Sequence, residues 1–138
     1  MPQSEPLLSI EAQLFHSGVR QYTQLLIENI ESHPDFEKVT EGLDLSLSNV
    51  IRTPESLKKF NITDIYLYLH IVDQHVEFDV DTKPFKADVV LEAEWATWKN
   101  IITGQEDLID CITTEKMRIL EGSDKFSFDV MSILTESI

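Results

Sequence analysis

Few side chains in this 138-residue sequence could do nucleophilic, acid–base or metal chemistry, and they are scattered along it. The histidines, His16, His33, His70 and His75, include no pair at the i, i+4 spacing of a zinc-binding helix. Cys111 has no base near it in the sequence that would activate its thiol as a nucleophile. The sequence therefore predicts no catalytic residue, no metal site and no cofactor, so we expect a protein that is not an enzyme.

His70 is the histidine with the strongest claim to a functional role, because it lies in a predicted strand and could face a cavity. Functional sites usually bring several perturbed groups together. No second candidate accompanies His70, so we interpret it as a hydrogen-bonded structural residue. The acidic residues mostly occupy alternate positions, as Glu77, Asp79 and Asp81 do, which is typical of a solvent-facing side.

Composition excludes several classes of protein. The net charge of −14, with only 11 Lys and Arg residues, argues against nucleic acid as a partner. No apolar run approaches the ~20 residues of a membrane span, so we expect no integral membrane association. The hydrophobic fraction of 42% is enough for a packed core. We therefore expect one domain over residues 1–138, acidic and located in the cytoplasm.

The first half of the chain predicts two helices and a strand. Val19, Tyr22, Leu26 and Ile30 share one helical face, which predicts a helix over residues 18–32 with Ser17 as its N-cap. A shorter helix is expected over residues 34–42. Residues 43–48 alternate leucine with polar residues, a pattern with the period of a strand. The structure of residues 1–14 is left open, and residues 49–61 are expected to be irregular.

The next segments predict a hairpin and a third neighbouring strand. Residues 65–71 are rich in strand formers on both faces, which favours a central strand. Asp73 and Gln74 would turn this strand back into residues 76–81, although the turn contains no glycine. Residues 87–91 form a further strand. Four strands are thus expected before the first tryptophan.

The last third of the chain predicts three helical segments around one more strand. Residues 95–102 form a helix that bears Trp95 and Trp98 and ends at Gly104. A short helix over residues 107–112 and a strand over residues 116–121 follow. Gly122 and Asp124 then turn the chain into an amphipathic segment over residues 125–138. The sequence as a whole predicts the α+β class: a single, mainly antiparallel five-stranded sheet with helices packed on one face.

This order of elements resembles the sterol carrier protein type 2 family of nonspecific lipid-transfer domains. In that family the corresponding helix ends at a glycine, matched by Gly104, and the later basic strand ends in a Gly-Asp turn, matched by Gly122 and Asp124. The chain departs from the family where Glu115 replaces the glycine that precedes the lysine of that strand. The resemblance implies that sheet and helices enclose a hydrophobic cavity for an apolar ligand, with the closing helix as part of its wall.

The closing helix carries an apolar arc wider than the roughly 100° that an ordinary surface helix needs. More of the same chain, a second subunit in a homodimer, or an apolar ligand could cover it. With the resemblance, we expect the following residues to line a ligand cavity: Trp95, Trp98, Ile101, Ile102, Ile112, Met117, Ile119, Phe126, Val130, Met131 and Leu134.

The function expected from this cavity is noncovalent binding, and transfer in the family's manner, of a lipid such as a fatty acid, an acyl thioester or a sterol-like molecule. Burying apolar ligand surface gains about 25 cal/mol per Å², so few polar contacts are needed. The alternative is an accessory or regulatory module that docks a partner protein in the same apolar groove. A small enzyme acting on an apolar substrate inside the cavity is a third and weaker interpretation.

Overall fold

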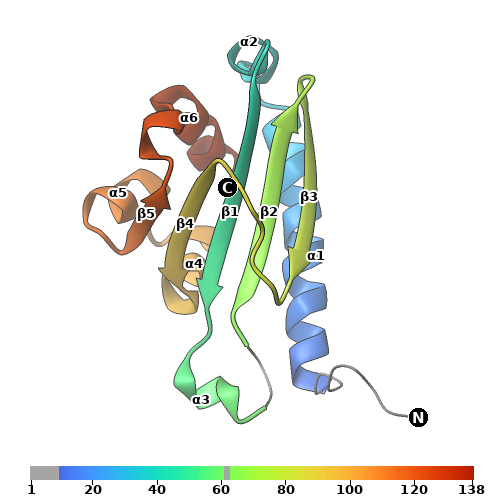
Figure 1. Ribbon diagram of the computed structural model, residues 1–138, viewed down its shortest axis with the longest axis vertical. Helices are drawn as coiled ribbons and strands as arrows, with labels where there is room; N and C mark the ends of the chain where they lie inside the picture. Colours follow the sequence, from blue (N-terminus) through green and yellow to red (C-terminus); the bar gives the residue numbers. More distant parts are fainter. Residues whose placement is uncertain (1–9, 61–62) are drawn as a thin grey trace.

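The structure, a computed structural model, describes residues 10–60 and 63–138. The first half contains α1 (Ile10–Glu31), α2 (Phe36–Thr40), β1 (Asp44–Arg52), α3 (Glu55–Lys58) and β2 (Ile65–Val72). The second half contains β3 (His75–Asp81), β4 (Val89–Glu94), α4 (Trp95–Ile102), α5 (Leu108–Thr113), β5 (Met117–Glu121), a 3-10 turn (Ser123–Lys125) and α6 (Phe128–Ser137). Figure 1 shows these elements in chain order.

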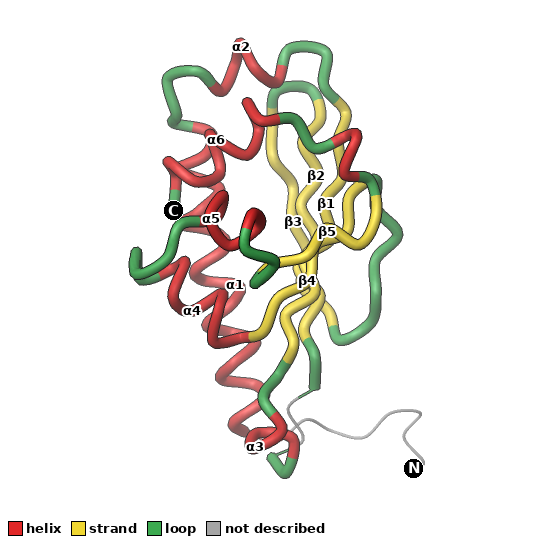
Figure 2. The backbone as a smooth tube through the Cα atoms, turned by 90° about the vertical axis from the view of Figure 1, so that its left-hand side faces the viewer, coloured by secondary structure: helices red, strands yellow, loops and turns green. Residues whose placement is uncertain are grey.

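The strands of the described residues form one five-stranded sheet in the order β3-β2-β1-β4-β5. The central strand β1 pairs in parallel with β4, whereas every other neighbouring pair is antiparallel. Helices α1, α4, α5 and α6 lie on one side of this sheet (Figure 2). The predicted α+β class, the mainly antiparallel five-stranded sheet and the one-sided helix layer are confirmed.

The hydrophobic core lies between the sheet and its helices. Alternate residues of each strand point into it, so that Leu47 of β1 lies between Leu69 of β2 and Val89 of β4 in register. The opposite face of the sheet is crossed by residues 82–88, which connect β3 to β4 (Figure 1). There the ring of Phe85 stacks on that of Tyr68 with 5.1 Å between centroids.

Two of the predicted boundaries were wrong by four residues or more, and the strand expected over residues 87–91 spans Val89–Glu94. α1 begins at Ile10, so Ser17 lies inside the helix rather than at its N-cap. Residues 10–15 are mostly good helix formers, and serine is tolerated in a helix interior. β1 continues to Arg52 instead of ending near Ser48, because it is paired on both sides and its residues 47–51 are all buried. A strand covered on both faces shows no alternation that would mark it in the sequence.

Two turns adopt left-handed backbone conformations without glycine. Asp73 and Gln74 have φ angles of 53° and 55°, as a two-residue hairpin turn requires, so the predicted hairpin is confirmed. Glu115 has a φ of 63°, at the position where the resembling family has glycine. The turn before β5 therefore has the left-handed conformation although glycine is absent. This conformation costs a residue with a side chain roughly 1–2 kcal/mol.

An ion-pair cluster joins the ends of three strands to the loop before β2. Arg52 donates from Nη1 to Asp64 Oδ2 at 2.8 Å and from Nε to Glu92 Oε2 at 2.9 Å, and Arg118 also pairs with Glu92. Hydrogen bonding from Arg52 holds the pKa of Glu92 below its usual value despite the opposing effect of burial. Burial pushes the pKa of Asp64 upward, but hydrogen bonds from Thr53 N–H and Arg52 outweigh it, so that pKa is also lowered.

We expect this cluster to make folding stability depend on acid. A carboxylate whose pKa is lowered by folding contributes stability above its unfolded pKa, near 4.5 for glutamate, and loses it as the pH falls through the folded value. The free energy of unfolding should therefore decrease below about pH 4.5. Urea titrations between neutral and acidic pH would measure this slope. Glu92→Gln should be less stable at neutral pH and should show a shallower loss, whereas parallel curves for the two proteins would contradict the prediction.

Candidate functional site

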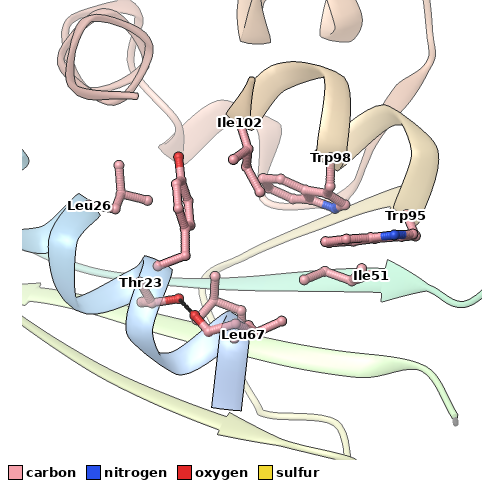
Figure 3. Close-up of a pocket in the computed structure, with 10 residues that line it drawn as sticks. Thr23, Leu26, Ile51, Leu67, Trp95, Trp98 and Ile102 are labelled. Atoms are coloured by element: carbon pink, nitrogen blue, oxygen red, sulfur yellow. Dashed lines mark hydrogen bonds between the residues drawn. The ribbon is translucent and has the colours of Figure 1, made fainter. Parts of the chain in front are cut away.

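A cavity of about 340 Å³ lies between α1, α4 and the sheet. Its floor is formed by Ile51 of β1 and Leu67 of β2, both buried. The other lining residues come from the two helices: Gly18, Val19, Tyr22, Thr23 and Leu26 from α1, and Trp95, Trp98 and Ile102 from α4. Figure 3 shows the two helices facing each other across the space above the strands.

The lining residues of α1 follow the helical period. Gly18, Tyr22 and Leu26 are each four residues apart and form a row along one side of the helix. Val19 and Thr23, one residue further on, form a second row that is fully buried against the sheet. Members of the first row are half-buried or exposed, so the cavity opens to the surface along this row.

The lining residues of α4 also share one helix face. Trp95, Trp98 and Ile102 follow the i, i+3, i+7 spacing, and all three are partly exposed. Their neighbour Ile101 is 2% exposed and points into the core instead. α4 is placed over the cavity because β4 runs directly into it at Trp95, without an intervening loop. The mouth of the cavity therefore lies between the partly exposed rows of α1 and α4.

The lining has few polar side-chain atoms. The Thr23 hydroxyl is hydrogen-bonded within the protein, and the Trp98 nitrogen is buried. The hydroxyl of Thr23 donates to the carbonyl oxygen of Val19 at 2.7 Å (dashed line in Figure 3). The indole N–H of Trp98 is buried and has no hydrogen-bond partner among the described residues. The cavity therefore presents carbon surface almost throughout.

Tyr22 is the one titratable residue among the described residues that line the cavity. Burial raises the pKa of its phenol above the usual value, so it stays protonated at neutral pH. The described lining contains no carboxylate, histidine, cysteine, lysine or arginine. Such an arrangement can bury an apolar molecule, and the hydroxyls of Tyr22 and Thr23 are the polar side-chain groups that the described part of α1 adds to the lining.

The structure brings together three of the residues that the sequence predicted as ligand contacts, namely Trp95, Trp98 and Ile102. The others lie elsewhere: buried in the core are Ile101, Met117, Phe126, Val130 and Leu134, and partly buried against it are Ile112, Ile119 and Met131. The buried face of α6 leaves a void of about 10 Å³ against α1, α2 and the sheet, too small for more than a water molecule. Most of the apolar arc of α6 packs against α1, α2 and α5, whereas Phe128 at the start of the helix is 65% exposed.

Sequence reasoning missed the contribution of α1 and of the sheet floor. Val19, Tyr22 and Leu26 share one predicted helical face, and this pattern could have indicated that α1 contributes to the cavity. That pattern indicates which side of a helix is covered, but not whether the covering elements fill the space. Ile51 gave no signal, because it lies in the segment expected to be irregular.

Three of the histidines have acidic partners, and the cysteine is buried. His70 Nε2 lies 2.6 Å from Asp44 Oδ1 on the sheet face away from the helices, which confirms its interpretation as a hydrogen-bonded residue. His33 pairs with Glu136, and His75 pairs with Glu31. Cys111 is 1% exposed, and burial raises the pKa of its thiol, which disfavours the reactive thiolate.

Within residues 10–60 and 63–138, no group of three or more His, Cys, Asp or Glu side chains is placed to hold a metal ion. In the same part of the chain, no helix has the length and apolar character that crossing a membrane requires.

Comparison with solved structures identifies the fold. A conserved hypothetical protein from Thermus thermophilus, provisionally described as a sterol carrier protein, matches with a TM-score of 0.63 and 14% identity, over 85% of this chain and 86% of that one. A crystal structure of sterol carrier protein 2 matches with a TM-score of 0.62 and 13% identity, over 85% and 87% of the two chains. A palmitated sterol carrier protein 2-like protein from Aedes aegypti matches with a TM-score of 0.50 and 13% identity, over 80% and 92%.

No family model matches the sequence, and no curated protein matches it either. The likeness is therefore one of three-dimensional structure at low sequence identity. Most of the chain has the fold of sterol carrier protein 2, which confirms the resemblance inferred from the order of its elements.

Proposed function

We propose that this sterol carrier protein 2-like chain binds a lipid or another apolar small molecule noncovalently in the cavity between α1 and α4. The observation that carries the proposal is the cavity itself, about 340 Å³ and lined almost wholly by carbon atoms. Ligand pockets in proteins typically span roughly 300–1,000 Å³, and the cavity falls at the lower end of that range. The fold supports the proposal, because one of the matching structures is a palmitated protein.

Hydrophobic burial would supply most of the binding free energy. Apolar surface removed from water gains about 25 cal/mol per Å², so a ligand that buries roughly 200 Å² gains about 5 kcal/mol before entropic costs. The two tryptophans contribute rigid, flat surface at low cost in conformational entropy. Because the described lining residues include no carboxylate, histidine, cysteine or lysine, we propose a binding or carrier protein in the cytoplasm rather than an enzyme.

Intrinsic fluorescence gives a direct test. Trp95 and Trp98 are the two tryptophans of the chain, and both line the cavity, so their emission should report ligand entry without a label. Titration with octane, 2-octanone or octanoate should change the emission saturably for at least one of these probes. Native mass spectrometry of the freshly purified protein should also show a bound apolar mass.

The competing function is docking of a partner protein or of a second copy in the same groove. It predicts a ligand-free dimer in native mass spectrometry and an emission change that depends on protein concentration rather than on the probe. If none of the three probes changes the emission of the folded protein, the small-molecule proposal is overturned.

A further inference from the structure

The volume of the cavity sets the size of the ligand that can be enclosed. An apolar cavity of about 150 Å³ holds a benzene molecule, which has six heavy atoms. By that measure the cavity between α1 and α4, at about 340 Å³, encloses about a dozen heavy atoms. A long fatty acid or a complete sterol would project through the mouth, whereas a medium-chain molecule fits entirely inside.

The charges around the cavity disfavour an anionic ligand. No lysine or arginine is among the described lining residues, and the whole chain carries a net charge of −14. Arg20 lies on α1 between lining residues, but it donates to the carbonyl oxygen of Val80 at 2.8 Å and pairs with Asp79 at 3.3 Å. A carboxylate drawn into this apolar space would lose its hydration without gaining a cationic partner.

One polar group of the lining remains available to a ligand. The hydroxyl of Tyr22 has no hydrogen-bond partner within residues 10–60 and 63–138. The hydroxyl of Thr23 is already used by Val19, and the N–H of Trp98 is covered. A protonated phenol donates to a ketone oxygen, and it either donates to or accepts from an alcohol hydroxyl. A ligand with one such oxygen would pair with Tyr22 and leave the rest of its surface against carbon.

We infer that the cavity takes a neutral, medium-chain molecule of about a dozen heavy atoms, with one ketone or alcohol oxygen hydrogen-bonded to the Tyr22 hydroxyl. This inference rests on the proposed function and adds the chemical class of the ligand to it. The site discriminates against medium-chain carboxylates through the cost of burying their charge. It accepts a plain hydrocarbon, which makes no hydrogen bond to the Tyr22 hydroxyl.

The test compares three probes of equal chain length, octane, 2-octanone and octanoate, on the wild-type protein and on Tyr22→Phe. Dissociation constants are measured at pH 8, where octanoate is ionised and Tyr22 is protonated. Tyr22→Phe removes one oxygen from a half-buried side chain, and its melting temperature verifies that it is folded. Tyr66→Phe, in β2 and outside the cavity lining, serves as the matched control.

We expect Tyr22→Phe to weaken 2-octanone binding roughly three- to tenfold while octane binding stays the same, because a single net hydrogen bond is lost. Tyr66→Phe should change neither. Octanoate should bind the wild-type protein at least about tenfold more weakly than 2-octanone does. Equal loss for octane and 2-octanone, or octanoate binding as tight as that of the ketone, would overturn the inference while the proposed function stands. Failure of all three probes to bind would instead overturn the proposed function.

Discussion

Replacing Gly18 with phenylalanine is expected to block ligand uptake while leaving the protein at least as stable as the wild type. Gly18 lies in α1 at the edge of the cavity, and a Cβ added there would meet no atom within 4 Å. The new ring would share the helix face of Tyr22 and occupy the space that a ligand needs. Affinity for octane or 2-octanone should fall at least roughly tenfold, about 1.4 kcal/mol.

The melting temperature distinguishes a blocked cavity from a misfolded protein. Glycine in a helix interior costs about 0.5–1 kcal/mol relative to alanine, so both Gly18→Phe and Gly18→Ala should raise the melting temperature. Gly18→Ala adds only a methyl group and should keep its ligand affinity, which makes it the matched control. The two tryptophans are untouched, so the same fluorescence titration applies. A stable Gly18→Phe protein that binds the probes normally would place the ligand site elsewhere.

The largest loss of stability from a single methyl group is expected at Gly122. This glycine follows β5 with a φ of 77°, and a Cβ added to it would lie 1.9 Å from the backbone oxygen of Asp88. Asp88 is held in place because its carboxylate accepts from the backbone and hydroxyl of Ser46 at 3.0 and 3.1 Å. Its N–H also donates to the Ser46 hydroxyl at 2.8 Å. The backbone at Asp88 therefore cannot move aside without breaking these bonds.

Gly122→Ala should accordingly lower the free energy of unfolding by about 3 kcal/mol or more, of which roughly 1–2 kcal/mol reflects the left-handed backbone and the rest the clash. Gly104→Ala is the matched control, because Gly104 also has a φ of 77° but has nothing within 4 Å of an added Cβ. Gly104→Ala should lower the free energy of unfolding by roughly 1–2 kcal/mol, through the backbone effect alone. Urea unfolding of both variants measures the difference, and equal losses would refute the assigned role of the Asp88 contact.

The two tryptophans illustrate what a helical pattern can reveal about a site. Trp95, Trp98 and Ile102 were predicted as ligand contacts, and they do line the cavity. The apolar residues of α6 were expected there for the same reason, a broad apolar face. In the structure most of that face packs against α1, α2 and α5, while Phe128 stays exposed, so other parts of the chain account for most of the pattern. Apolar periodicity shows that a face is covered, but it carries no information on what covers it.

The order of the elements other than α3, the hairpin at Asp73 and Gln74, and the turns at Gly104 and Gly122 could be predicted from the sequence, because each depends on residues close together in the chain. Side-chain period, turn chemistry and backbone freedom act locally. The position of the cavity depended on tertiary structure. It arises where α1 and α4, more than sixty residues apart in the printed sequence, approach over Ile51 and Leu67 without filling the space between them. That gap is set by the spacing of packed elements, which no local pattern encodes.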